Sequence, residues 1–307
     1  MSSPEPGATT ARPRRILEVD AGDLTPVLAR PSLPTYLAQL WQRRHFVMAD
    51  ARAQVASTSR SNLLGSAWLV LNPLLNGAVY FVIFGLVLSA DRGIENYPGY
   101  LIVGVFLFQY TIHSLVQGSR AVTGGRALIR SFAFPRAALP IAVVVRQTIR
   151  FVPALVTMLV LVAALPFVLR LVNPGGAPVE LRLTWLWLLL PAVLVLQLLF
   201  NTGLALLAAR ATARIPDLTQ LFSLVARFWL YASAVFFSID RFAAYPALHA
   251  VMAANPMFLV LDIARDLLLY AALPAWQSWA VLGAWSGGLA VVGTVVFWWG
   301  EETYGAS

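Results

Sequence analysis

The chain has 307 residues, of which 59% are hydrophobic and only 12% are charged, whereas about 25% of the residues of a soluble domain are charged. These proportions exclude an ordinary soluble domain and indicate an integral membrane protein. Cysteine and lysine are both absent, which excludes disulfides, thiolate metal sites, Schiff-base lysines and the P-loop whose lysine holds nucleotide phosphates.

The amino-terminal residues 1–33 are rich in Pro, Ser, Ala and Arg and show no apolar period, which predicts a disordered cytoplasmic tail. Residues 34–58 are predicted to form one amphipathic helix. This helix either lies in the headgroup plane of the membrane or packs on a cytoplasmic partner, and the two arrangements are compatible. Its apolar face holds Leu37, Leu40, Trp41, Met48 and Val55.

Six stretches are long enough to cross a hydrocarbon core, which needs roughly 20 apolar residues of helix. Backbone polar groups in lipid must find their partners within the segment, so these stretches are predicted to be helices. The expected fold is an all-α integral membrane protein, with six transmembrane helices in residues 59–300 and a short tail at 301–307. The stretches are 66–90, 99–118, 139–168, 184–208, 221–239 and 277–299.

Arginine is concentrated on one side of these predicted spans, and short cytoplasmic loops are the ones that keep positive charge. Both termini are therefore predicted to be cytoplasmic, in a multi-pass membrane protein. The arginines on this side are Arg12, Arg14, Arg15, Arg30, Arg43, Arg44, Arg52, Arg60, Arg120, Arg126, Arg130, Arg136, Arg210 and Arg214.

The first span begins abruptly after Arg60, in RSNLLGSAWLVLNPLL. Ser61 or Asn62 is predicted to cap its free N–H groups, and Gly65 permits close approach of another helix. Pro73 removes one backbone hydrogen bond about two turns into the span. It either kinks the helix or relieves its packing against a neighbour.

The second arginine-rich loop reads GGRALIRSFAFPRAALP over residues 124–140. Aromatic rings within a basic rim are typical of a docking surface for a cytoplasmic partner. The alternative is a positively charged loop whose phenylalanines enter the bilayer. The residues of this candidate surface are Arg126, Arg130, Phe132, Phe134, Pro135 and Arg136.

The chain resembles the permease subunits of ABC-2 type transporters, particularly those that export lipid-linked polysaccharides such as O-antigen, teichoic acid and mycobacterial galactan. The resemblance covers about residues 36–300. Its pieces are weak alone but specific together, because they occur in order and at suitable spacing. They are Leu64-Gly65, Trp68, Pro73, Phe84, Gly85, Tyr100, Gly104, Leu128-Ile129, Phe134-Pro135, Asp217, Asn255-Pro256 and Arg265.

This resemblance implies a permease of a bacterial inner membrane that moves a polyprenyl-pyrophosphate-linked polysaccharide, with galactan as the leading candidate, out of the cytoplasm. It implies a homodimer powered by two copies of a separate ABC ATPase subunit, which binds the ATP and Mg. This chain is then expected to be no enzyme, to hold no cofactor or metal and to bind no nucleic acid. Residues 124–137 are the expected coupling helix in the ATPase.

If the cargo is a glycan, aromatic rings within the spans are candidates to line its path. The C–H faces of sugars lie on such rings through weak contacts of roughly 0.5–1 kcal/mol. The alternative is that the rings face lipid, the protein core or the headgroup belt. The candidates are Trp68, Tyr80, Phe81, Phe106, Phe108, Tyr110, Phe228, Trp229, Tyr231 and Phe236.

Three arginines fall within predicted spans, where charge is costly. Arg146 and Arg150 are one helical turn apart in the third span, and Arg227 is about two turns into the fifth. They are expected either to bind the lipid pyrophosphate, because guanidinium matches phosphate geometry, or to extend to the headgroups.

The stretch 240–276 is interrupted at Asn255-Pro256 and at Pro274, which predicts two short helices that re-enter the outer leaflet. By the resemblance they form an outer gate with Asn255, Pro256, Asp262 and Arg265. Arg265 is expected to pair with Asp262 or Asp266, either as part of the gate or as a structural salt bridge.

Two other functions are open on the sequence: an ABC-2 exporter of small molecules or drugs, and a membrane-embedded glycosyl- or acyltransferase. The transferase is disfavoured because its catalytic cluster is missing, with His45, His113 and His249 on separate segments. A secondary transporter is disfavoured because no Asp or Glu falls in the middle of a predicted span.

Overall fold

The computed structural model describes residues 31–60, 67–87, 94, 96–125, 135–172 and 183–301, and most of these residues are helical. No strand occurs in these ranges, so the predicted all-α class is confirmed for them. The tail before residue 31 and the expected caps Ser61 and Asn62 lie outside the described residues.

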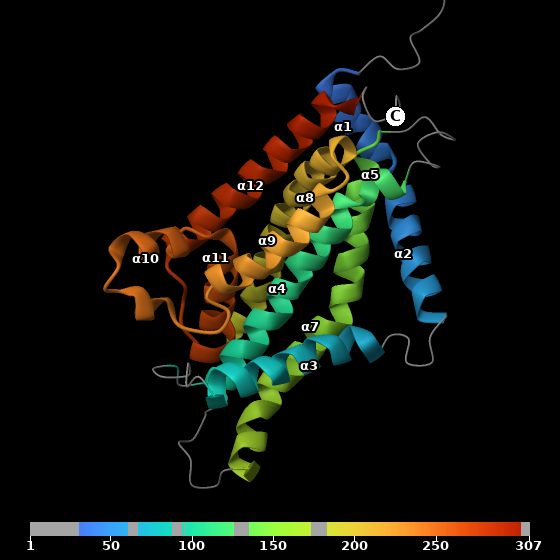
Figure 1. Ribbon diagram of the computed structural model, residues 1–307. Helices are drawn as coiled ribbons and strands as arrows, with labels where there is room; N and C mark the ends of the chain where they lie inside the picture. Colours follow the sequence, from blue (N-terminus) through green and yellow to red (C-terminus); the bar gives the residue numbers. More distant parts are fainter. Residues whose placement is uncertain are drawn as a thin grey trace, which may run out of the picture.

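Four helices are long and apolar enough to cross a membrane, and they match the predicted second, third, fourth and sixth spans. Figure 1 shows them as a bundle of inclined rods. The central helix, α4, packs against α3, α7, α8, α9 and α11. The four are α4 (Tyr97–Ser119), α7 (Ala138–Val172), η3 (Trp185–Leu189) continued by α8 (Leu190–Arg214), and α12 (Trp276–Trp299).

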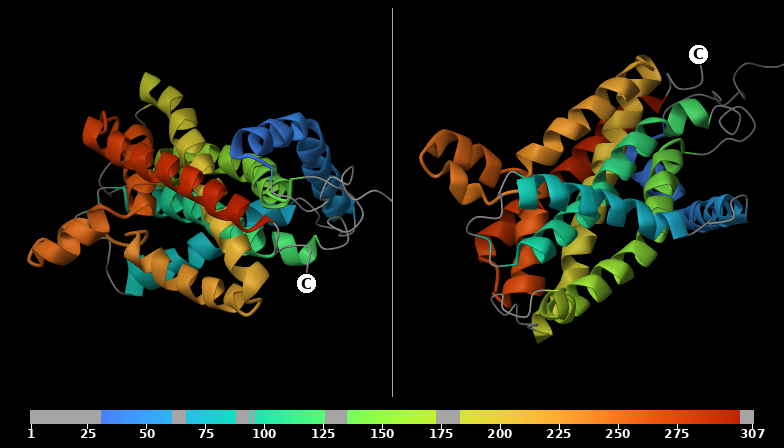
Figure 2. Two further views of the ribbon diagram at one scale, coloured as in Figure 1. Left: turned by 90° about the horizontal axis from the view of Figure 1, so that it is seen from above. Right: turned by 60° about the horizontal axis from the view of Figure 1, so that its bottom comes forward.

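The predicted first and fifth spans differ from expectation. In the first, α3 (Ala67–Tyr80) continues through the buried Pro73 into a π-helix, η2 (Phe81–Val87), and lies across α4 and α7 (Figures 1 and 2). In the fifth, α9 (Leu218–Ala232) has 15 residues, about 22 Å of helix against a core of about 30 Å. By length and composition the described residues therefore supply four spans, or five if the bent pair α10–α11 counts as one.

The predicted amphipathic helix at 34–58 is two helices that meet at Arg43. Tyr36, Val47 and Ala51 turn into the protein, whereas Leu37 and Trp41 of the predicted apolar face remain exposed. An exposed apolar face is what a helix in the headgroup plane requires. The two helices are α1 (Leu33–Gln42) and α2 (Arg44–Arg60).

The segment after α9 forms a separate cap at the end of the bundle away from α1 (Figure 1). The chain bends by 78° between α10 and α11, which confirms the break predicted at Asn255-Pro256. The elements of the cap are η4 (Ile239–Phe242), α10 (Pro246–Ala253), α11 (Pro256–Arg265) and the π-helix η5 (Asp266–Tyr270).

Two glycines let α8 and α12 pack with their backbones in contact. A Cβ atom on Gly203 would overlap the backbone of Leu289, and one on Gly293 would lie 2.6 Å from the carbonyl oxygen of Gly203. In lipid, helix association depends on such close packing, because burial of apolar surface supplies little driving force there.

We expect Gly203→Val to lower the thermal unfolding midpoint in detergent, because its side chain must force α8 and α12 apart. Overpacking of this kind costs about 1–3 kcal/mol. The matched control is Gly287→Ala on α12, where an added Cβ meets no atom within 4 Å. Equal midpoints for Gly203→Val and the control would show that this contact does not hold the two helices.

Candidate functional site

A buried arginine joins three segments at the end of the bundle away from α1 (Figure 1). Arg265 of α11 is 2% exposed. Its guanidinium donates hydrogen bonds to the backbone carbonyls of Tyr100 on α4 and of Ala234 and Val235 after α9, at 3.2–3.3 Å. It also lies over the Tyr100 ring, 3.3 Å from the centroid. The contact with the ring and four charge-assisted bonds to three carbonyls replace the water that Arg265 loses on burial.

The backbone around Arg265 is shaped to admit the guanidinium. Ala234 adopts a left-handed conformation with φ of 51°, an uncommon and strained geometry for a residue with a Cβ. A Cβ on Gly104 would lie 2.6 Å from the Nη2 atom of Arg265. Tyr100 and Gly104, one turn apart on α4, therefore form one structural unit with Arg265, which is far from them in the sequence.

Asn255 binds the end of α9 to the start of α11. Its amide nitrogen donates to the carbonyl of Ala232 and to the hydroxyl of Ser233, each at 3.1 Å. Its oxygen accepts from the indole of Trp229 and from the backbone N–H of Met257, each at 3.0 Å. The amide thus caps α11, which begins at Pro256.

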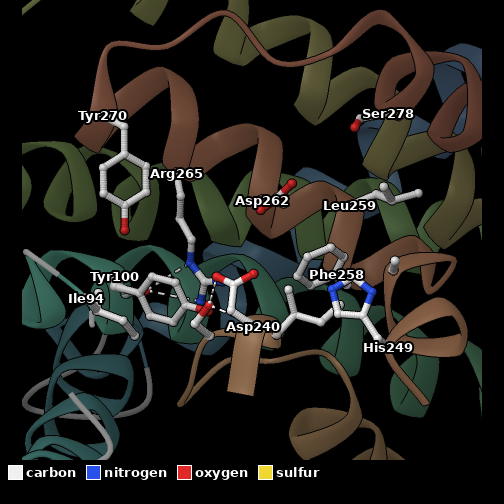
Figure 3. Close-up of a pocket in the computed structure, with 13 residues that line it drawn as sticks. Ile94, Tyr100, Asp240, His249, Phe258, Leu259, Asp262, Arg265, Tyr270 and Ser278 are labelled. Carbon is white, nitrogen blue, oxygen red and sulfur yellow. Dashed lines mark hydrogen bonds between the residues drawn. The ribbon is translucent and has the colours of Figure 1, made fainter. Parts of the chain in front are cut away.

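The predicted salt bridge of Arg265 with Asp262 or Asp266 is replaced by these backbone contacts. Carbonyl oxygens of a non-helical turn need donors at this depth, and the guanidinium supplies several in one plane. Asp262 still interacts electrostatically with Arg265. Both line a cavity of about 670 Å³, together with Asp240, His249 and Tyr270. Figure 3 shows these side chains reaching the cavity from different elements.

An aromatic cluster lies next to this anchor, where η2 meets the end of α9. Phe84 and Phe236 stack with ring centroids 4.4 Å apart, Tyr80 lies 4.7 Å from Phe236, and Tyr231 lies 5.3 Å from it. The structure therefore brings together three of the predicted path residues from the first and fifth segments. Sequence alone placed them on separate helices.

The other predicted path residues are dispersed. Phe81 contacts Tyr97, and Phe108 meets Trp229 edge-on at 5.8 Å in the core. Phe228 is exposed. Trp68, Phe106 and Tyr110 line a second cavity, between α3, α4 and α7.

The three arginines proposed for pyrophosphate binding are not gathered at one place. Arg150 lines the second cavity, and Arg146, one turn earlier on α7, interacts electrostatically with both Arg150 and Asp50 of α2. Arg227 is exposed on α9, and α4 packs between α7 and α9 (Figure 2). Arg227 therefore lies on a different helix from Arg146 and Arg150 within one copy of the chain, and their binding of pyrophosphate stays a prediction.

The candidate docking surface lies mostly outside the described residues, which include Pro135 and Arg136 but none of Arg126, Arg130, Phe132 and Phe134. Glu301, just after α12, binds the described end of this surface. One of its carboxylate oxygens accepts a hydrogen bond from the backbone N–H of Arg136 and the other accepts one from the Tyr36 hydroxyl, both at 2.8 Å. The same hydroxyl accepts from the N–H of Ala137. We call Tyr36, Arg136 and Glu301 the inner clasp.

Sequence reasoning missed the inner clasp and the role of Gly104. The spacing of Tyr36, Arg136 and Glu301 along the chain carries no local pattern. Gly104 was recognised only as part of the family resemblance, and the need for its missing side chain appears only once Arg265 is placed beside it.

We expect Arg265→Gln to destabilise the protein by about 1–3 kcal/mol, because the carbonyl of Val235 loses its guanidinium donor while that of Ala234 keeps the Tyr100 hydroxyl. Arg265→Lys should recover little of the loss, since an ammonium lacks the planar fork. Thermal unfolding in detergent measures this, with the exposed Arg241→Gln as the control. Unfolding of the Gln variant at the wild-type midpoint would contradict this role of Arg265.

Burial raises the pKa of the Glu301 carboxyl, and its bonds from Arg136 and Tyr36 offset this only in part. The folded state then binds the proton more tightly than the unfolded state. The contribution of the Glu301 carboxyl to the stability of the folded state is present at acidic pH and is lost as the pH rises through its folded-state pKa. The unfolding midpoint of the wild type should therefore fall relative to that of Glu301→Gln between acidic and neutral pH. A constant difference would contradict this.

The chain was compared with known proteins. The ABC-2 type transporter family matches residues 46–269. An O-antigen export system permease protein, RfbA, of Myxococcus xanthus is 29% identical over 71% of this chain and 78% of its own length. Two proteins of the same description from Klebsiella pneumoniae are 24% and 28% identical, over 68% and 59% of this chain and 74% and 64% of their own lengths.

These matches confirm the resemblance drawn from the residues of the first span, the loop and the outer segment. The four described helices that are long and apolar enough to cross a membrane agree with a membrane transporter family. The chain therefore belongs to the ABC-2 type transporter family and is a multi-pass inner-membrane protein.

Proposed function

We propose that this chain is the permease of an exporter that moves a polyprenyl-pyrophosphate-linked polysaccharide out of the cytoplasm. The observation that carries the proposal is the family match together with relatives described as O-antigen export permeases. Galactan is the polymer we favour, and a second copy of the chain completes the path.

The orientation is inferred from charge and from the position of the chain ends. The inner clasp holds α1 beside the end of α12, and the Trp298 indole donates to the carbonyl of Pro31. Both ends of the described chain thus lie on one side. That side holds the arginine-rich loops, which the positive-inside rule assigns to the cytoplasm.

The energy comes from two copies of a separate ABC ATPase that hold ATP and Mg. The candidate docking surface runs directly into Pro135 and Arg136, at the start of α7. Because the inner clasp ties Arg136 to Glu301 and Tyr36, a displacement of this loop reaches α7, α12 and α1 together. These contacts give the ATPase a mechanical connection to the bundle.

The glycan would move over the exposed and clustered aromatic rings of α3 and α9. Trp68, Phe228 and Tyr231 each keep at least 40% of their surface exposed. Contacts between rings and sugar faces are worth roughly 0.5–1 kcal/mol each, weak enough for a chain to slide from one ring to the next. The aromatic cluster then leads to the outer gate, where Asn255 and Arg265 hold α11.

Depletion of the chain in its native host tests this function. We expect a long lipid-linked polysaccharide to accumulate in the cytoplasmic leaflet, since synthesis continues while export stops. Re-expression of the wild type should clear it, and an unrelated membrane protein at equal level is the control. Unchanged lipid-linked glycans after depletion would contradict the proposed function.

A further inference from the structure

A small polar cavity lies where α3 crosses α4 and α7. Its volume is about 160 Å³, large enough for one small polar group. The first two turns of α3 contribute Trp68, Asn72 and Pro73 to the wall of the cavity, and α4 and α7 contribute the other lining residues. The other lining residues are Phe106, Gln109, Tyr110, His113, Gln147, Arg150, Phe151 and Ala154.

The wall of this cavity combines hydrogen-bond donors with an aromatic floor. Asn72, Gln109, Gln147, His113 and Arg150 all carry N–H groups, and none of the described lining residues is acidic. Tyr110 and Phe151 stack with centroids 4.7 Å apart and planes within 9°. The only formal charge on the wall is the positive charge of Arg150, so the cavity favours an anionic, oxygen-rich group.

Gln147 supplies an independent observation. Its side chain is 6% exposed, and its amide nitrogen has no hydrogen-bond partner. A buried donor left unpaired costs about 1–3 kcal/mol. Since Gln147 also lines the cavity, an oxygen atom bound there would satisfy this donor.

The position of the cavity indicates where its ligand comes from. Gln147 and Arg150 are in the first half of α7, near the end that carries the inner clasp. Trp68, at the start of α3, is 40% exposed and stands at the rim. In the proposed orientation this depth is that of the inner leaflet.

We propose that this cavity binds the phosphate of a lipid headgroup from the inner leaflet, with Arg150 and Gln147 as donors and Trp68 at the entrance. The assignment of that lipid to the exported glycan carrier rests on the proposed function. The binding of a phosphate group in this cavity is argued from the lining residues and is independent of the proposed function. Of the three arginines considered above, only Arg150 is assigned to this site.

Lipid retention tests the proposal. The full chain, co-purified with its ATPase subunit in a maltoside detergent that carries no phosphate, is supplied with a polyprenyl phosphate, phosphatidylglycerol or the phosphate-free polyprenol. Native mass spectrometry then counts bound lipid. Arg150→Gln and Gln147→Leu should each weaken retention of polyprenyl phosphate about tenfold, because each removes a bond to a charged oxygen. Polyprenol should be retained weakly by every variant.

Matched variants separate binding from folding. Arg170→Gln removes an exposed arginine at the far end of α7 and should retain lipid as the wild type does. Ala154→Leu fills the cavity without altering charge and should also abolish retention. Gln147→Glu adds a carboxylate and should repel phosphate more strongly than Gln147→Leu. Stronger retention of polyprenyl phosphate by the Glu variant than by the wild type would overturn the proposal.

The comparison of polyprenyl phosphate with phosphatidylglycerol identifies which lipid supplies the phosphate. Loss of polyprenyl phosphate with unchanged phosphatidylglycerol supports the glycan carrier, whereas equal loss of both supports the phosphate site with bulk phospholipid as its occupant. Equal retention by wild type, Arg150→Gln and Gln147→Leu would overturn the site. Because the assay needs no export, its failure is distinguishable from failure of the depletion experiment.

Discussion

The contacts of Arg265 with three backbone carbonyls solve the main physical problem of this fold. In lipid, backbone that leaves the helix must be satisfied by protein groups, since water is scarce. The turn after α9 breaks helical geometry, and the guanidinium supplies donors to its carbonyls while it also binds α4. The short α9, the bent pair α10–α11 and the aromatic cluster all depend on this turn.

The two ends of the molecule are built by different means. At the outer end, one buried cation and the Asn255 amide fix short helical pieces through backbone hydrogen bonds. At the inner end, the inner clasp ties segments that are far apart in the chain. Between them, glycine contacts hold α8 against α12. A rigid bundle with separately tied ends is suited to transmit a displacement along its length.

Much of the fold was predictable from the sequence because lipid imposes a simple rule of length and hydrophobicity. The second, third, fourth and sixth spans and the break at Asn255 follow from apolar runs and from Pro256. The crossing of α3 and the early end of α9 did not follow, because apolar composition gives no direction in space. The division at Arg43 was missed because no Pro or Gly marks it.

The candidate site was less predictable, since its parts meet only in three dimensions. The aromatic residues were recognised as a class, but their grouping around Phe236 depends on the turn that Arg265 holds. Asp262 and Asp266 were natural partners for Arg265 by spacing, yet unsatisfied carbonyls competed for it. Gln147 gave no sequence signal, because a glutamine within an apolar run is also typical of a satisfied core residue.

The central claim is that this chain forms a path and a docking surface while a separate ATPase supplies the energy. Reconstitution into proteoliposomes loaded with lipid-linked polysaccharide tests it most directly, by measuring how much glycan becomes accessible on the opposite side. The account predicts translocation only when the ATPase subunit and ATP are both present. Translocation by the purified chain alone, or ATP hydrolysis by it, would contradict the account.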